Sequence, residues 1–204
     1  RNDNPEAKDI LPEVRRLIFE GKSKEAKPIM EKKFRTPRNG MPYQTIGSLK
    51  LHFDGHENYT DYYRDLDLTR AVATTRYKVN GVTYTRELFT SFADNVVIMQ
   101  ITSDKQGALN FTADYVSPLK HTVSTKKGKL ILSGKGADHE GVPGVIRLEN
   151  QTFIKTTDGK VKTSDNKISV SDATTATIYI SAATNFVNYN DVSANEHKRA
   201  DAYM

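Results

Sequence analysis

The strongest constraint on the fold of this chain is a series of segments in which apolar and polar residues alternate one by one. Residues 49–53, 71–79 and 82–88 follow this pattern. Because successive side chains of a β-strand point to opposite faces, the pattern predicts strands with one buried and one solvated face. Asn80-Gly81 joins two of these segments and predicts a tight hairpin, since both residues tolerate a positive φ.

The rest of the chain between residues 36 and 190 continues the β pattern. The continuously apolar segment 96–101 predicts a central strand covered on both faces. Asp158-Gly159 predicts a second hairpin turn. In all, about eleven strands are expected, at a spacing of roughly 8 to 12 residues that is typical of a sandwich. Residues 134–144 are predicted to form a long surface loop, and residues 185–191 an irregular segment.

The two ends of the chain predict helices instead. Apolar residues recur every three or four positions from Ile10 to Ile18, with Asn4 as the expected N-cap and Gly21 as the expected C-cap. A second helix is expected over residues 23–34, and residues 195–204 resemble the start of a third.

The expected fold class is therefore mainly β, an antiparallel β-sandwich with an N-terminal helical pair packed on it. The domain boundaries follow from these element predictions. Residues 1–35 are interpreted as a helical insertion of the same domain, 36–190 as the β-sandwich and 191–204 as the start of a helical linker.

Composition excludes some chemistry and leaves other chemistry open. The chain has no cysteine, which excludes disulfides and thiolate metal sites. Its net charge is +5, and the cations concentrated in residues 22–38 are interpreted as a solvated helix face. Binding of nucleic acid by these cations is the alternative, but no nucleic-acid-binding motif accompanies them. No apolar run approaches the roughly 18 residues that a membrane span needs.

The polar clusters of the sequence do not predict a catalytic or metal site. The segments 54–57 and 138–140 each combine a histidine with carboxylates, but neither supplies an obvious fourth ligand. Asp61, Asp65 and Asp67 are expected on the polar face of a strand, paired with nearby arginines. Such pairing lowers a carboxyl pKa, which does not suit the general acid of a glycosidase. No catalytic residue, metal or cofactor is therefore predicted.

Three tyrosines are the candidates for binding carbohydrate. Tyr59, Tyr62 and Tyr63 lie in or beside a predicted strand, where exposed rings can stack on a sugar. Cross-strand packing is the more common use of such rings. The absence of tryptophan also argues against a dedicated sugar-binding platform.

Several motifs together resemble one enzyme family. They are the segment 41–49, which contains Gln44-Thr45-Ile46-Gly47-Ser48-Leu49, then 61–68, the hairpin 79–87 and the segment 182–189. The chain resembles, over nearly its whole length, the N-terminal β-sandwich of glycoside hydrolase family 95, the α-L-fucosidase-type enzymes. Thr45 and Ser48 stand where the family commonly has proline and aspartate.

The resemblance implies a larger bacterial enzyme, secreted or periplasmic, that hydrolyses α-linked fucose or galactose with inversion. Its catalytic groups belong to an (α/α)₆ barrel that has no counterpart in these residues. The expected function is a non-catalytic domain that packs on that barrel, with carbohydrate bound by the parent enzyme. The alternative is a carbohydrate-binding β-sandwich module. The family's opening strands are expected before Arg1, so the resemblance also predicts unpaired strand edges.

Overall fold

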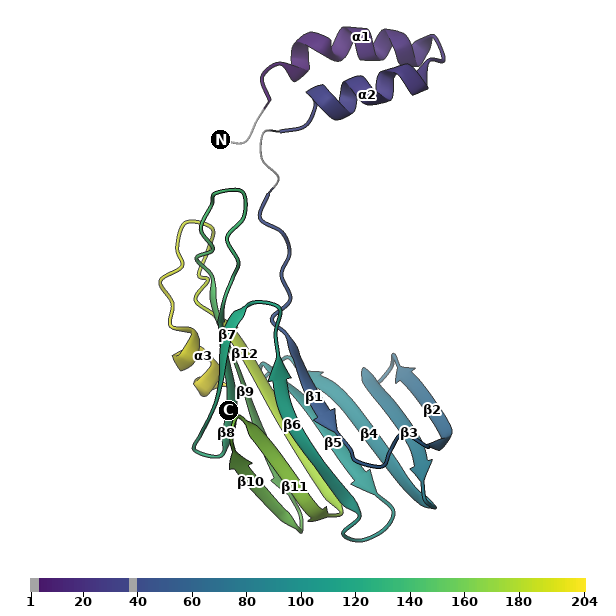
Figure 1. Cartoon of the computed structure of the whole chain (residues 1–204), viewed down its shortest axis with the longest axis vertical. Helices are drawn as coiled ribbons and strands as arrows, with labels where there is room; N and C mark the ends of the chain where they lie inside the picture. The colour runs from purple at the N-terminus through teal and green to yellow at the C-terminus, as the bar shows by residue number, and fades with distance from the viewer. Residues whose placement is uncertain (1–3, 37–39) are drawn as a thin grey trace. The chain divides into compact units, whose positions relative to one another are not determined.

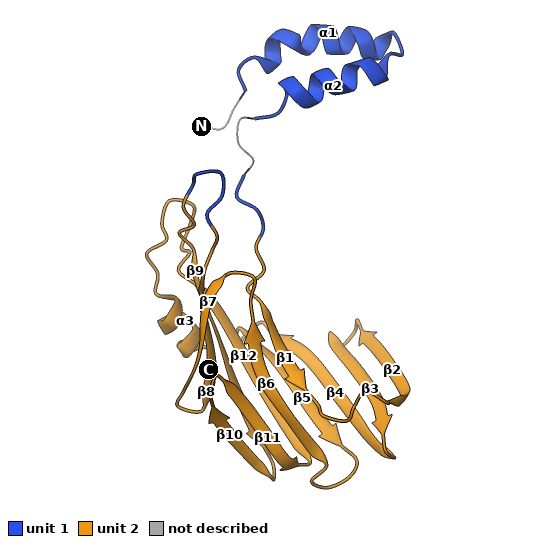
Figure 2. Ribbon diagram, viewed as in Figure 1, with its two compact units in different colours: residues 1–43, 138–142 blue, residues 44–137, 143–204 orange. Residues whose placement is uncertain are grey.

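The computed structural model describes residues 4–36 and 40–204, which form two compact units (Figures 1 and 2). Unit 1 contains the N-terminal helices and residues 138–142, and unit 2 contains residues 44–137 and 143–204. Each unit is described by itself below. In the described residues, no helix is both long and apolar enough to cross a membrane.

Unit 1 contains a pair of helices with a small core of its own. Helix α1 spans Ala7–Phe19 and helix α2 spans Ser23–Lys33. The core consists of the buried residues Val14, Leu17 and Ala26, with Ile29 and Phe34 packed against them. Packing of this pair on the sandwich stays a prediction.

The end of α1 confirms the predicted role of Gly21. Gly21 has a φ of 74°, and its N–H donates to the carbonyl of Ile18. The next N–H, of Lys22, donates to the carbonyl of Leu17. These two bonds form the Schellman motif, in which a left-handed glycine satisfies the last helical carbonyls.

The start of α1 differs from the sequence prediction. The helix begins at Ala7, and Glu6 occupies the N-cap position without a side-chain cap. Asn4 accepts a hydrogen bond from the N–H of Glu6, and its amide donates to the carbonyls of Lys33 and Arg35. Asn4 therefore ties the entry of α1 to the end of α2, because both of its amide hydrogens find acceptors there.

Unit 2 contains two antiparallel sheets built from twelve strands in the described residues. The smaller sheet has the order β1 (Ser48–His52), β6 (Leu109–Val116), β11 (Lys167–Ala173) and β10 (Lys160–Ser164). The larger has the order β2 (Thr60–Asp67), β3 (Val72–Val79), β4 (Val82–Ser91), β5 (Val96–Ser103), β12 (Thr175–Thr184), β9 (Arg147–Thr156), β8 (Lys129–Lys135) and β7 (Lys120–Lys126). This sandwich confirms the predicted fold class.

The core of unit 2 lies between the facing sheets. Alternate residues of β6 supply one side, from Leu109 to Tyr115, while Ile101 and Ile178 are among those of the larger sheet. All of these side chains are at most 6% exposed. The alternation predicted for 71–79 and 82–88 is confirmed, since Tyr77 and Val79 of β3 and Tyr84 of β4 also belong to this core. Strand β5 is central in its sheet as predicted, but only one of its faces is covered by the core, and on the other Ile98 is half-buried and Gln100 exposed.

The Asn80-Gly81 hairpin is confirmed: the two residues have φ values of 48° and 80° between the paired strands β3 and β4. The hairpin predicted at Asp158-Gly159 is wrong, because β9 belongs to the larger sheet and β10 to the smaller one, so this turn carries the chain from one sheet to the other. Gly159 has a φ of 71° in this turn. A Cβ at Gly159 would lie 2.4 Å from the carbonyl oxygen of Ser171, so the close approach of two backbones also requires glycine there.

Strands β2 and β1 each form an edge of one sheet. Strand β2 is an edge of the eight-stranded sheet, and all but one of its residues are exposed. Strand β1 is an edge of the four-stranded sheet and pairs with β6 alone. Edges with free backbone groups can accept further strands. Whether the family's opening strands pair here stays a prediction.

Candidate functional site

The predicted acidic cluster is only partly reproduced. Asp61 has a φ of 52° beside an irregularity in the β2–β3 pairing, and it forms an ion pair of 3.2 Å with Lys78. Asp67 accepts hydrogen bonds from the backbone N–H groups of Thr69 and Arg70, which closes the turn to β3. The expected arginine pairs do not appear among the described ion pairs.

The three candidate tyrosines do not share one face of the sheet. Tyr59 and Tyr62 lie together, with ring centroids 5.5 Å apart, and Tyr59 also contacts Tyr77. Tyr63 lies under the guanidinium of Arg76 instead, at 5.6 Å. Because residues 76 and 77 point to opposite faces of β3, Tyr63 lies on the other side of the sheet from the pair. Their role in binding sugar stays a prediction.

A cluster of aromatic rings around Arg86 lies at the end of β1 nearest to β3 and β4. The guanidinium of Arg86 lies 4.5 Å from the ring centroid of Phe53 and 5.2 Å from that of Tyr77. It also donates to the hydroxyl of Tyr77 at 2.9 Å. His56 contacts the same hydroxyl through Nδ1 at 3.0 Å and packs on Tyr84 at 4.5 Å. We call these five residues the Arg86 cluster.

Burial and the charge of Arg86 both affect the pKa values of the ionisable groups in the Arg86 cluster. Burial lowers the pKa of His56, and the positive charge of Arg86 lowers it further. Burial raises the pKa of Tyr77, against the opposing charge of Arg86. The cluster therefore holds a cation among neutral rings at pH 7, an arrangement that packs the sandwich and contains no carboxylate for glycoside hydrolysis.

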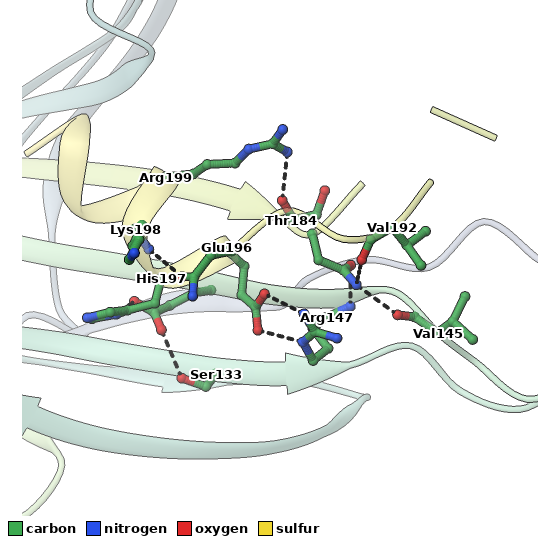
Figure 3. Close-up of polar contacts among 12 residues, drawn as sticks. Ser133, Val145, Arg147, Thr184, Val192, Glu196, His197, Lys198 and Arg199 are labelled. Carbon is green, nitrogen blue, oxygen red and sulfur yellow. Dashed lines mark hydrogen bonds and ion pairs between the residues drawn. The ribbon is translucent and has the colours of Figure 1, made fainter. Parts of the chain in front are cut away.

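A second polar network lies where helix α3 (Glu196–Ala202) packs on the larger sheet (Figure 3). His197 contacts Glu149 Oε1 through Nδ1 at 2.7 Å, and the amide of Gln151 donates to the same oxygen at 2.8 Å. Lys129 donates to Gln151 Oε1 and to Asp201. Glu149 and Gln151 are at most 5% exposed, so α3 covers polar groups that are paired with one another.

Asn185 organises the chain between β12 and α3. Its side-chain oxygen accepts from the N–H of Arg147 at 2.8 Å, and its amide donates to the carbonyls of Val145 and Val192 (Figure 3). The side chain is completely buried. The segment predicted as irregular is therefore held by a specific polar residue, because it has few ladder bonds of its own.

Several carboxyl groups of unit 2 have a pKa that clearly differs from the ordinary value. In each of these groups the pKa is lowered. Burial would raise the pKa of Glu196, but the hydrogen bonds and charge of Arg147 outweigh it and lower the pKa. Hydrogen bonds from Thr174 lower the pKa of Asp158, and Lys129 lowers that of Asp201. These groups stay ionised near neutral pH, which suits structural anchors better than a proton donor.

Sequence reasoning missed both clusters. His56 was considered only as a metal ligand, nothing in the sequence pairs it with Arg86, and Glu149 and His197 are 48 residues apart. A run of four polar residues inside a predicted strand, 149–152, was the available signal, because such a run needs partners if it is buried. Among the described residues, no three histidine or acidic side chains converge as metal ligands do.

Comparison with known families shows to which family the chain belongs. The model of the glycosyl hydrolase family 65 N-terminal domain matches residues 1–189. The chain therefore belongs to this family of N-terminal domains, and the prediction that it is the N-terminal domain of a glycoside hydrolase is confirmed.

Two individual proteins are similar to the chain. Alpha-L-fucosidase 2 of Arabidopsis thaliana is 38% identical over 136 residues, which is 64% of this chain. The chain spans only 16% of the length of that relative. A putative kojibiose phosphorylase from the human microbiome has a similar fold, with a TM-score of 0.50 at 9% identity over 75% of this chain and 23% of that one.

Proposed function

We propose that this chain is the non-catalytic N-terminal β-sandwich of a glycoside hydrolase that resembles the α-L-fucosidases of family 95. The parent enzyme hydrolyses terminal α-fucosyl or α-galactosyl linkages with inversion, and the sandwich packs on its (α/α)₆ catalytic barrel. The observation that carries the proposal is the 38% identity to a fucosidase of which the chain spans 16%. A region that makes up so small a part of an enzyme is more typical of a supporting domain than of the catalytic domain.

The chemistry of the described residues supports a non-catalytic role. A glycosidase needs a carboxylic acid with a raised pKa beside a second carboxylate. In unit 2 the carboxyl groups with a clearly altered pKa have a lowered one, and Glu149, Glu196 and Asp201 each contact a basic side chain. The acidic side chains of the α3 network therefore act as anchors for the helix.

Hydrolysis of an aryl α-L-fucoside tests the proposal. The 204-residue chain is expected to release no aryl alcohol, and the longer parent protein is expected to release it. Turnover by the chain alone would contradict the non-catalytic role. A parent that cleaves neither aryl α-fucosides nor aryl α-galactosides would contradict the proposed substrate class, and the anomer of the released sugar reports inversion.

A free-standing carbohydrate-binding module is the second candidate function. The adjacent rings of Tyr59 and Tyr62, each 53% exposed, favour it. This function predicts saturable binding of L-fucosides to the chain and its loss in Tyr62→Ala. Tyr63→Ala is a matched control, because Tyr63 lies on the opposite face of the sheet.

The proposal extends to the setting of the parent enzyme, which we infer to be bacterial and either periplasmic or secreted. The support is the motif resemblance given above. Fractionation of the source cells, followed by detection of the parent protein, tests the location; recovery in the cytoplasmic fraction would contradict it.

A further inference from the structure

The face of the larger sheet that points away from the core carries a row of apolar side chains. Ile98, Tyr179 and Phe153 are direct cross-strand neighbours on β5, β12 and β9. Their chain neighbours Ile178 and Ile154 belong to the core, so this row points to the opposite face. Phe153 remains 38% exposed.

Helix α3 already covers part of this same face. Ala200 is completely buried, and its carbonyl accepts a hydrogen bond from the hydroxyl of Ser181, two residues along β12 from Tyr179. The polar network under α3 pairs the sheet groups that the helix covers. The helix therefore shows how this sheet binds a helical layer: a small residue allows close approach, and polar side chains at the rim anchor it.

The covered area stops short of the apolar row and leaves a hollow beside it. This hollow, of about 380 Å³, is lined by the row and Val96, by Asp94 and Lys155, and by Tyr203 and Met204, which follow α3. We call this hollow with the apolar row the α3 groove. Its volume suits large side chains, and an apolar patch of this kind commonly marks an interaction site.

We propose that the α3 groove receives the apolar face of a second helix, supplied by the part of the parent glycoside hydrolase outside this chain and lying beside α3. The inference rests on the proposed function and specifies which face of the sandwich contacts the rest of the enzyme. A helix is the occupant that continues the layer begun by α3, with apolar residues at i, i+3 and i+4 entering the hollow. The curated relative has ample chain for this, since the matched region is 16% of its length.

Cysteine labelling measures whether the groove is covered. The chain has no cysteine, so Phe153→Cys introduces a unique thiol in it. The thiol is labelled with a maleimide in the 204-residue chain and in the longer parent protein, and the modified peptide is quantified by mass spectrometry. Labelling is expected to be at least tenfold slower in the parent. Leu68→Cys, at a site 84% exposed after β2, is the control and is expected to react alike in both.

Oxidative footprinting of the unsubstituted proteins repeats the measurement without a variant. Tyr179 and Phe153 are expected to be oxidised in the chain and protected in the parent. Equal labelling and equal oxidation in the two proteins would overturn the proposal.

Two other occupants would overturn the proposal as well. Protection in the 204-residue chain that grows with its concentration would identify a second copy in the groove, and protection by added L-fucose would identify a sugar site. Fucoside hydrolysis is measured separately, so a parent with a protected groove and no activity would refute the proposed substrate while leaving the docking surface supported.

Discussion

At the scale of single residues, the buried polar side chains of this domain are the ones with the most specific partners. Asn185 connects two backbone groups at the entry to β9, of Val145 and Arg147, with the carbonyl of Val192 before α3. Tyr115 on β6 reaches the hydroxyl of Thr152 on β9 at 2.6 Å. Neither side chain is replaceable by an apolar residue of similar size without leaving a partner unpaired, which costs more than the bond itself contributes.

Asn185→Ala is expected to lower the free energy of unfolding by roughly 2–4 kcal/mol, because it leaves buried donors and acceptors without partners. Chemical denaturation of the variant measures this. Asn188→Ala is the matched control, since Asn188 is exposed and its side chain accepts one hydrogen bond from Asn190. Equal losses in the two variants would contradict the role of Asn185.

Tyr115 predicts a loss of stability at alkaline pH. Burial raises the pKa of Tyr115 from 10 to about 12, against the opposing hydrogen bond of Thr152. The folded protein thus keeps a proton that the unfolded chain releases above pH 10. The contribution of Tyr115 to stability is complete below pH 10 and is lost as the pH rises toward 12, by roughly 2–3 kcal/mol.

Tyr115→Phe removes this titration, so the fall in unfolding free energy between pH 9 and 12 is expected to be smaller in the variant. At pH 7 the variant loses about 1 kcal/mol, because Thr152 loses its partner. An unchanged alkaline slope would show that Tyr115 does not titrate in this range.

At the scale of elements, α3 contacts the sandwich through one buried face. Ala200 is completely buried, whereas Ala202 in the same short helix is exposed. Glu149 and Gln151 on β9 depend on this contact, because the helix supplies His197 and Asp201 to their network.

Ala200→Glu is expected to detach α3, because a carboxylate cannot enter the space that the methyl group fills. Thermal unfolding measures the loss, expected at about 2 kcal/mol or more. Ala202→Glu changes the charge equally at an exposed position and is expected to cost less than about 0.5 kcal/mol. Similar effects of both substitutions would show that charge, not packing, is responsible.

At the scale of the whole molecule, each compact unit has its own hydrophobic core. The helical pair buries Val14, Leu17 and Ala26, and the sandwich buries a separate and much larger set. Independent cores predict that the sandwich folds without the helices, because the residues that stabilise it all lie within unit 2.

A chain shortened to residues 44–204 is expected to keep a β-rich circular dichroism spectrum and a cooperative thermal transition. The unshortened chain is the reference, and its spectrum is expected to differ by the helical contribution of α1 and α2. Loss of the cooperative transition on shortening would show that the helices are needed for the sandwich to fold.

The sequence by itself determined the strands, the two helices of unit 1, the Asn80-Gly81 hairpin and the class of glycoside hydrolase N-terminal domain, because each depends on local patterns. The period-2 alternation of β3 and β4 and the Asn80-Gly81 turn need no knowledge of distant residues. The motif resemblance likewise identified the glycoside hydrolase domain before any contact was known.

Only the tertiary structure decided which residues meet. The tyrosines at 59, 62 and 63 are close in sequence, yet they divide between two faces of the sheet. Arg86 gathers rings from the two strands β3 and β4 and from the loop after β1, and Glu149 contacts His197 across 48 positions. These contacts depend on strand order and on the docking of α3, because both bring distant segments together. A local pattern in the sequence does not show which distant segments pair.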